Sequence, residues 1–212
     1  MRATAVACVL LLAALSAGAA TPREDARAAL GNADDVESRR AGARALGATG
    51  TMADAPALVQ ALRDADRVVR ALAERALWQL WSRSGDDEID GLMANGIEQI
   101  AAGDGAGAVV TFTRMIERRP DFAEGWNKRA TVYYLIGEYR KSLADCDEVM
   151  KRNPYHFGAL SGYGLIYLKL DQPARALDYF EQALRVNPNL DQVRETVETL
   201  RRVLIQQRKN TL

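Results

Sequence analysis

Hydrophobic and small side chains recur at a fixed distance along the second half of the chain. The stretch ALDYFEQALRVNPN places Ala176, Phe180 and Ala183 on one face of a predicted helix, which ends before Pro188. Weaker copies of this pattern lie 34 residues earlier and again 34 residues before that. A constant period of this length indicates stacked helical repeats.

Aligning the three copies at this period gives five columns of similar chemistry. Two columns hold small residues, one holds two phenylalanines and a cysteine, one holds apolar residues of mixed size, and one holds proline. In that order the members are Gly96, Ala130 and Gly164; Ala108, Ser142 and Ala176; Phe112, Cys146 and Phe180; Met115, Val149 and Ala183; and Pro120, Pro154 and Pro188. Small side chains let two antiparallel helices approach to about 8 to 10 Å, and proline lacks the amide that would continue a helix. The columns therefore predict an all-α fold, an α-solenoid of antiparallel helix pairs.

Each copy also contains a break that separates two helices, at Gly103–Gly105, Gly137–Tyr139 and Asp171–Pro173. With these breaks the pattern resembles tetratricopeptide repeats, three of them, in residues 86–189. The resemblance implies a right-handed superhelix. Residues 190–212 are expected to form a C-terminal capping helix and tail. The apolar stripe of that helix is predicted to hold Val193, Val197, Leu200, Val203 and Leu204.

Residues 21–85 have a different character, rich in alanine and arginine, with a weaker echo at a shift near 31. This region is similar to short bacterial HEAT-like repeats, in which an acidic turn precedes a helix that carries an arginine. Arg39 or Arg40 in the first copy and Arg70 in the second fill that place. Two such repeats bury little surface alone, so they are expected to stack on the first tetratricopeptide pair and continue one superhelix.

Trp78 and Trp81 lie three residues apart, on one face of the last helix of this N-terminal region. We expect them to form the core of the junction with the repeats, because large aromatic side chains anchor such contacts. An exposed pair that stacks on a ligand is the alternative.

The first 20 residues have the pattern of a secretory signal peptide. Arg2 precedes an apolar run at 5–15, and the small residues Ala17, Gly18 and Ala19 follow, so cleavage is expected after Ala19 or Ala20. The mature chain would then be exported, to a periplasm or out of the cell, and would meet a membrane only if this segment is retained. Cleavage also removes Cys8 and leaves Cys146 with no partner for an internal disulfide.

Composition argues against several classes of function. Lys plus Arg and Asp plus Glu both number 28, without long runs of one sign, so no nucleic-acid footprint is evident. A single histidine, His156, cannot build a site of several histidines, and we read it as a helix-start residue. Cys146 stands in a phenylalanine column and is expected to be buried. We therefore expect no catalytic residue, no metal and no cofactor.

The resemblance implies that the first helix of each tetratricopeptide pair lines a concave groove for a peptide or a partner helix. By position, the groove residues are Met93 and Ile97 in the first repeat, Asn127, Lys128, Thr131 and Tyr134 in the second, and Ser161 and Leu165 in the third. Alternatively, several of these face solvent or the neighbouring pair.

Family members that hold the acidic tails of chaperones carry Lys, Asn and Arg at places filled here by Met93, Ile97, Gly158 and Gly162. That activity is therefore not expected, and a partner with hydrophobic side chains and few charges is favoured.

The leading hypothesis is a non-catalytic adaptor or scaffold of the bacterial cell envelope that binds a protein or peptide. One alternative is a HEAT-type lyase that acts on a tetrapyrrole–protein conjugate, to which no residue set here points. Another is an envelope assembly component that self-associates.

Overall fold

The computed structural model describes residues 20–210, and all regular elements within that range are helical. The predicted signal peptide, except Ala20, lies outside the described residues. A short 3₁₀ helix, η1, spans Met52–Asp54. The α-helices are α1 (Pro22–Leu30), α2 (Val36–Thr49), α3 (Ala55–Ala61), α4 (Arg67–Ser82), α5 (Asp87–Ala101), α6 (Gly105–Arg118), α7 (Ala123–Leu135), α8 (Tyr139–Arg152), α9 (Phe157–Lys169), α10 (Pro173–Val186) and α11 (Asp191–Asn210).

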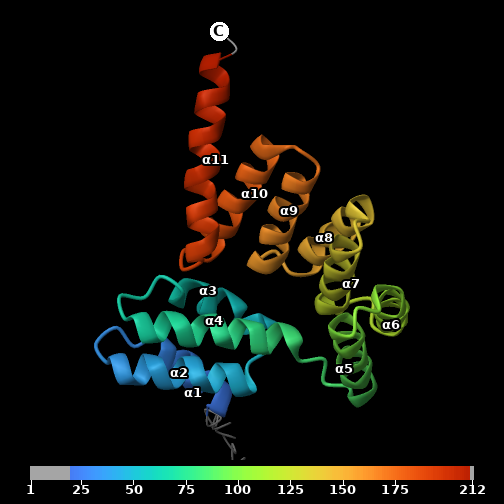
Figure 1. Cartoon of the computed structure of the whole chain (residues 1–212). Coiled ribbons are helices and arrows are strands. Elements are labelled where there is room, and N and C mark those ends of the chain that lie inside the picture. The colour runs from blue at the N-terminus through green and yellow to red at the C-terminus, as the bar shows by residue number, and fades with distance from the viewer. Residues whose placement is uncertain (1–19, 211–212) are drawn as a thin grey trace, which may run out of the picture.

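Helices α5 to α10 form three antiparallel pairs that follow one another in an arch (Figure 1). The predicted breaks form the turn inside each pair, where Gly103, Gly137 and Asp171 have φ angles of 77°, 81° and 54°. Positive φ costs glycine little, and asparagine and aspartate tolerate it better than most residues. The predicted all-α solenoid of helix pairs is thus confirmed.

The repeat columns form the contact between the two helices of each pair. A Cβ atom added to Gly96 would lie 2.4 Å from the ring of Phe112, and one added to Gly164 would lie 2.5 Å from the ring of Phe180. Because the first helix has a glycine at this position, the phenylalanine ring of the second helix has room to pack against it. In the middle pair Ala130 has a Cβ, and the smaller Cys146 stands opposite.

Helices α1 to α4 form an N-terminal block around a core of leucine, alanine and Trp81. Two arginines connect its helices to the preceding loops in the same way. Arg39 donates to the carbonyls of Asn32 and Ala33, and Arg70 donates to those of Asp64 and Ala65. Both arginines thus bind the turn that precedes their helix, whereas the resemblance to HEAT-like repeats stays a prediction.

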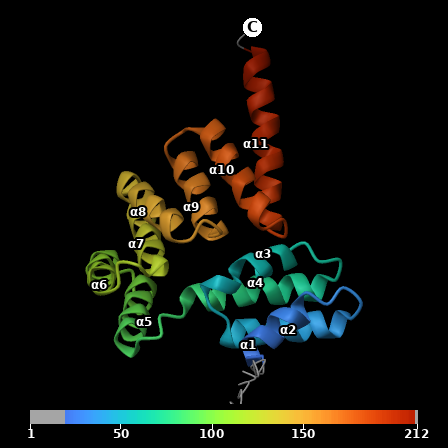
Figure 2. The ribbon, with the colours of Figure 1, turned by 180° about the vertical axis from the view of Figure 1, so that it is seen from behind.

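The N-terminal block does not continue the superhelix by stacking on the first pair, which corrects the expectation from the sequence. Gly85, at φ 70°, lies in the short link between α4 and α5, and α5 leaves the block at this point. The block instead packs against the start of α9 and the turn between α10 and α11. Figures 1 and 2 both show it below these helices.

Polar contacts fasten the block to the turn between α10 and α11. The Asn189 side chain donates to the Leu62 carbonyl at 2.8 Å and accepts from Arg70 Nε at 3.0 Å. Arg63 donates to the carbonyls of Arg185 and Val186. Segments more than 100 residues apart in sequence are thereby held together.

The last helix, α11, packs on α10 through Val197 and Leu200, as the stripe predicts. Val203 was also predicted to be buried, but it is 43% exposed, because α11 extends past the end of α10 (Figure 1). The position one period after Gly164 is Glu198, which is exposed, so the column of small residues does not continue into α11. Within residues 20–210, none of the helices combines the length and apolar character that a membrane span requires.

Candidate functional site: a concave groove between the helix pairs

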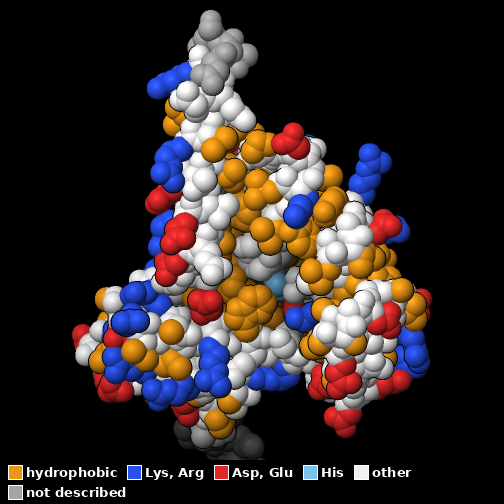
Figure 3. Space-filling view, in the orientation of Figure 1, with side chains coloured by type: hydrophobic (Ala, Val, Ile, Leu, Met, Phe, Trp, Pro, Cys, Tyr) orange, Lys and Arg blue, Asp and Glu red, His pale blue; other side chains and the backbone are white. Residues whose placement is uncertain are grey.

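The inner side of the arch is hollowed between the N-terminal block and the repeats. Figure 3 shows this hollow at the centre of one face, with hydrophobic side chains along its walls. Two openings lie there: one beside α4 and one between α7, α8 and α9. The first is lined by α4 residues alone, and the second by residues of all three helices around it.

The opening between α7, α8 and α9 has a volume of about 160 Å³, and we call it the groove cavity. Four of the eight predicted groove residues line it: Asn127, Thr131, Tyr134 and Leu165. The rest of its wall is small or apolar and consists of Ala130, Ser142, Cys146, Gly158, Ala159, Gly162 and Ile166. The structure therefore gathers half of the predicted set around one concave opening.

The groove cavity exists because the middle repeat departs from its own pattern. Cys146 fills the place that Phe112 and Phe180 fill in the other pairs, and it leaves space that a ring would occupy. A Cβ added to Gly162 would have the Cys146 sulfur as its nearest neighbour, at 3.8 Å, which is ordinary van der Waals contact. There is thus room beside Gly162 on the α9 side of the cavity.

The thiol of Cys146, which lines the groove cavity, is unreactive at neutral pH. Burial, followed by the nearby charges of Asp145 and Asp147, raises the pKa of Cys146 to about 12. A thiol with so high a pKa is protonated at neutral pH and is a poor nucleophile. The predicted burial of Cys146 is confirmed, at 3% exposure, and the side chain acts as a small apolar surface.

The other four predicted groove residues do not line the groove cavity. Lys128 pairs with the Glu124 carboxylate at 3.0 Å, and Ser161 donates to the Phe157 carbonyl at 2.8 Å. Met93 packs against the core of the first pair, and Ile97 is 46% exposed on α5. Their part in binding stays a prediction.

A buried ionisable pair next to the groove was not predicted. Glu124 on α7 and His156 before α9 are 1% and 0% exposed, and His156 Nε2 lies 3.1 Å from a Glu124 oxygen. The Ala159 amide donates to His156 Nδ1 at 3.0 Å, so the ring proton of the neutral imidazole lies on Nε2 and is donated to Glu124. His156 is the N-cap of α9, which confirms the helix-start prediction.

The charge of Glu124 is kept despite burial. Desolvation, the largest effect, raises its pKa, but hydrogen bonds from His156 and Lys128 and the positive charge of Lys128 outweigh it and lower the pKa overall. One sequence signal could have found this pair. Residues 124 and 156 are almost one period apart, and such positions lie at the same end of neighbouring repeats.

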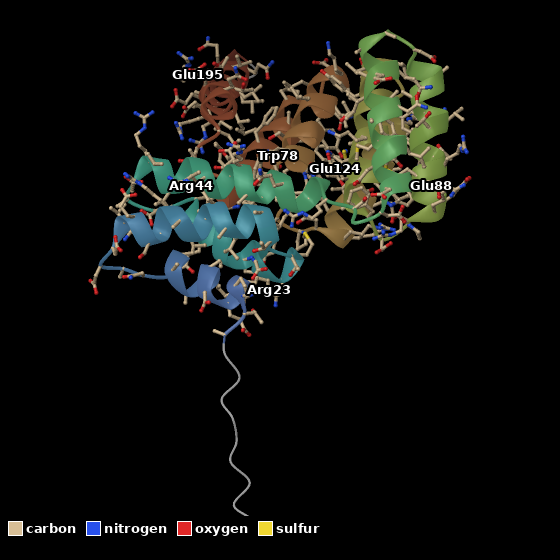
Figure 4. The ribbon with its side chains drawn as sticks, turned by 90° about the horizontal axis from the view of Figure 1, so that it is seen from below. Arg23, Arg44, Trp78, Glu88, Glu124 and Glu195 are labelled. Atoms are coloured by element: carbon tan, nitrogen blue, oxygen red, sulfur yellow. The ribbon has the colours of Figure 1, made fainter. Side chains whose placement is uncertain are left out.

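Trp78 and Trp81 form the core of the junction, as predicted, although the junction lies at the third repeat. The Trp81 ring stacks on His156 at 4.5 Å, and Trp78 meets Trp81 edge-on at 5.1 Å. Trp78 also covers Gly158, where an added Cβ would lie 2.7 Å from its ring. Figure 4 shows Trp78 and Glu124 near each other where the block meets the repeats.

Trp78 connects the groove cavity to the second opening. It lines a shallow hollow of about 510 Å³ on α4, together with Glu74, Arg75 and other α4 residues. The concave face therefore extends from the α7 and α9 helices onto the N-terminal block. Among the described residues, no group of three or more His, Cys, Asp or Glu side chains could hold a metal ion.

Comparison with known proteins agrees with the geometry of the helix pairs. Residues 157–190, which cover α9, α10 and the turn after them, match the sequence model of the tetratricopeptide repeat. Residues 157–190 thus have the sequence pattern of a tetratricopeptide repeat.

Curated relatives match part of the chain. A TPR repeat-containing protein of Rhizobium etli is 34% identical over 120 residues, which are 57% of this chain and 59% of the relative. Subunit 7 of the anaphase-promoting complex of Dictyostelium discoideum is 34% identical over 83 residues, 39% of this chain and 14% of that protein. The chain thus spans about three fifths of the first relative and a much smaller part of the second.

Solved tetratricopeptide domains have the same fold as this repeat region. The Sgt2 domain of Aspergillus fumigatus superposes with a TM-score of 0.55 at 21% identity, covering 58% of this chain and 83% of that domain. The first tetratricopeptide domain of Spaghetti (RPAP3), solved bound to the HSP90 peptide SRMEEVD, superposes with a TM-score of 0.53 at 18% identity, covering 56% and 94%. At these identities the likeness concerns the fold alone.

Proposed function

We propose that this protein is a non-catalytic scaffold that holds a partner protein through the concave face of its tetratricopeptide repeats. The observation that carries the proposal is the groove cavity, a preformed opening on the face that the repeats curve around. Side chains that anchor a protein interface insert into such small, well-packed openings.

The lining of the groove cavity favours a hydrophobic side chain of the partner. Its floor is Ala130, Cys146 and Ile166, while Asn127, Thr131 and Tyr134 place polar atoms at its wall. An aliphatic or aromatic side chain would fill the floor, and the polar wall would hydrogen-bond to the partner backbone. We propose an extended peptide or a helix that presents one such anchor.

The charges beside the groove cavity favour a partner with few acidic groups. Lys128 and Arg129 are the cations nearest in sequence to the lining of α7, and both are already paired, with Glu124 and with Asp145. Two structural neighbours were solved with Hsp90 or Hsp70 peptides, but their identity to this chain is 18% and 20%. Because Met93, Ile97, Gly158 and Gly162 carry no charge, we propose a different kind of partner for this protein.

We further propose that the scaffold works in the bacterial cell envelope after export. The support is the signal-peptide pattern of residues 1–20. Fractionation of cells that express the whole chain, with mass spectrometry of its N-terminus, tests this. A chain that starts at Ala20 or Thr21 in the envelope fraction is the expected result, and an uncleaved chain in the cytoplasm contradicts it.

The groove is tested by filling the cavity without disturbing the fold. The double variant Ala130→Gly with Cys146→Phe reproduces the glycine and phenylalanine of the other two pairs and closes the opening. Affinity capture from an envelope extract, with partners identified by mass spectrometry, should lose its main partner with this variant. Asn127→Ala and Tyr134→Ala should weaken the capture.

The matched control is Val110→Ala, on α6 outside the groove, where the side chain is 60% exposed. It should capture as the unchanged chain does. If the filled variant folds and captures the same partner equally well, the binding site is not the groove cavity and this proposal is wrong.

A further inference from the structure

A further, partly open cavity, distinct from the groove, lies where the N-terminal block meets the second repeat. Its volume is about 180 Å³, and we call it the junction cavity. Residues from the end of α4, the start of α7 and the end of α8 line it. A water molecule takes about 30 Å³ of liquid volume, so the junction cavity has room for an ion larger than water.

Two side chains in its wall carry N–H donors that have no partner. Trp81 Nε1 and Asn153 Nδ2 make no hydrogen bond to the described residues, although the two residues are 4% and 1% exposed. A buried donor without an acceptor costs about 1 to 3 kcal/mol, so such groups are rare unless something binds them.

The unpaired Trp81 N–H is stronger evidence for a ligand than the unpaired Asn153 amide. Asn187, in the corresponding turn of the next repeat, also has an unpaired Nδ2, so that feature belongs partly to the turn itself. Trp81 has no such counterpart. His156 stacks on its ring, and Trp78 and Phe157 pack against it. The indole N–H is therefore left without an acceptor in an otherwise well-packed side chain.

The start of α7 adds backbone donors on the same wall. Its N-cap is Phe122, which has no side-chain oxygen to accept from the first amides of the helix, and Phe122 and Ala123 both line the junction cavity. Unpaired amides and the helix dipole make a helix N-terminus favourable for an anion.

Three arginines also line the junction cavity, and their charges exceed those of the carboxylates near them. Arg119 pairs with Asp121, also in the lining, at 3.4 Å, and Arg152 pairs with Glu148 at 2.5 Å. Arg83 donates to the carbonyls of Gly47 and Gly50, and among the described residues it forms no ion pair. One positive charge is therefore left uncompensated beside the unpaired donors.

From these three features we propose that the junction cavity binds a small oxyanion, a phosphate or a carboxylate. The anion would accept from Trp81 Nε1, Asn153 Nδ2 and the start of α7, and Arg83 and Arg119 would balance its charge. Because these groups come from the N-terminal block and from the repeats, the bound anion would fasten the two together. This site is independent of the partner groove.

Calorimetric titration of the whole mature chain tests the site. Sodium phosphate and sodium acetate are the two probes, in a buffer without oxyanions and with the ionic strength held constant by sodium chloride. Phosphate or acetate should bind and raise the melting temperature of the protein, and the tighter of the two tells which oxyanion the site prefers.

Three variants test whether the heat measured in the titration comes from binding in the junction cavity. Arg119→Gln should weaken binding at least about tenfold, because a charged hydrogen-bond donor is lost. Trp81→Phe keeps an aromatic ring and removes the N–H, and it should weaken binding without unfolding the chain. Arg118→Gln removes the same charge from the adjacent residue, which pairs with Glu88 and does not line the junction cavity, so it should bind as the unchanged chain does.

The proposal is overturned if neither probe binds, or if Arg118→Gln weakens binding as much as Arg119→Gln. In the second case the effect is one of overall charge. If Trp81→Phe unfolds the chain, the comparison of Arg119→Gln with Arg118→Gln still decides between the two outcomes.

Discussion

One residue, Cys146, determines what the middle repeat offers to a partner. In the outer pairs a phenylalanine rests on a glycine, and the space between the two helices is filled. In the middle pair the two positions have changed together, to cysteine and alanine, and the groove cavity adjoins them. The repeat columns are therefore pairs of positions whose sizes depend on each other, and stability should follow the pair.

This dependence predicts that Cys146→Phe alone destabilises the protein by about 1 to 3 kcal/mol, because the ring would press on the Ala130 Cβ. Adding Ala130→Gly should recover most of the loss, since glycine gives the ring its space in the other pairs. Denaturation by urea, with unfolding free energies for both variants, measures this. A double variant that loses as much stability as Cys146→Phe and Ala130→Gly lose together would show that the two positions are independent.

Such columns can be found in the sequence because they recur at a fixed period. A residue whose role occurs only once leaves no periodic pattern to find. Gly96, Phe112 and the prolines could be placed from their spacing alone. Apart from its spacing from His156, nothing in the sequence indicates that Glu124 is buried, because an acidic residue in the first turn of a helix is ordinarily exposed. Its burial depends on His156 from the next repeat and on Trp81 from the N-terminal block.

At the scale of elements, Glu124 and His156 connect the starts of α7 and α9, two of the three helices that border the groove cavity. The neighbouring groups that hold the Glu124 charge are Lys128 on α7 and His156. A shift in the protonation of Glu124 would therefore act on the spacing of these helices.

The lowered pKa of Glu124 has a definite consequence for stability. Its folded pKa lies below the ordinary value of 4.5, so the ionised carboxylate stabilises the fold above that pH, and the contribution is lost as the pH falls through the folded pKa. We expect Glu124→Gln to be less stable than the unchanged chain at neutral pH. The gap should narrow below about pH 4.5, because only the unchanged chain has this charge to lose.

Thermal unfolding of both chains between neutral and acidic pH checks this expectation. Glu88→Gln is a suitable control, because Glu88 is exposed and its pairing with Arg118 is a surface contact. A constant difference in melting temperature between Glu124→Gln and the unchanged chain at every pH would contradict the assignment.

At the scale of the whole molecule, the chain is closed on itself by contacts between its early and late segments. An open solenoid contacts only neighbouring repeats, so its order follows from the sequence period. Here Asn189 bonds to Leu62 and Arg70, 127 and 119 residues away. The period predicted the helix pairs but not this closure, because a local pattern does not say which distant ends meet.

Because of this closure, a substitution near one end of the chain should also destabilise the segments near the other end. Asn189→Ala removes the donor to the Leu62 carbonyl and the acceptor for Arg70, and it should cost about 1 to 3 kcal/mol. Hydrogen exchange should become faster in α3 and α4 as well as at the start of α11. Loss of protection confined to α11 would show that the N-terminal block folds without support from the repeats.

The same closure has a consequence for synthesis in the cell. A ribosome adds roughly 5 to 20 residues per second, so His156 and Phe157, the partners of Trp81, emerge about 4 to 15 seconds after it. Until then the nascent chain presents an aromatic face with nothing to cover it. Holding chaperones are expected to recognise the growing polypeptide during this interval.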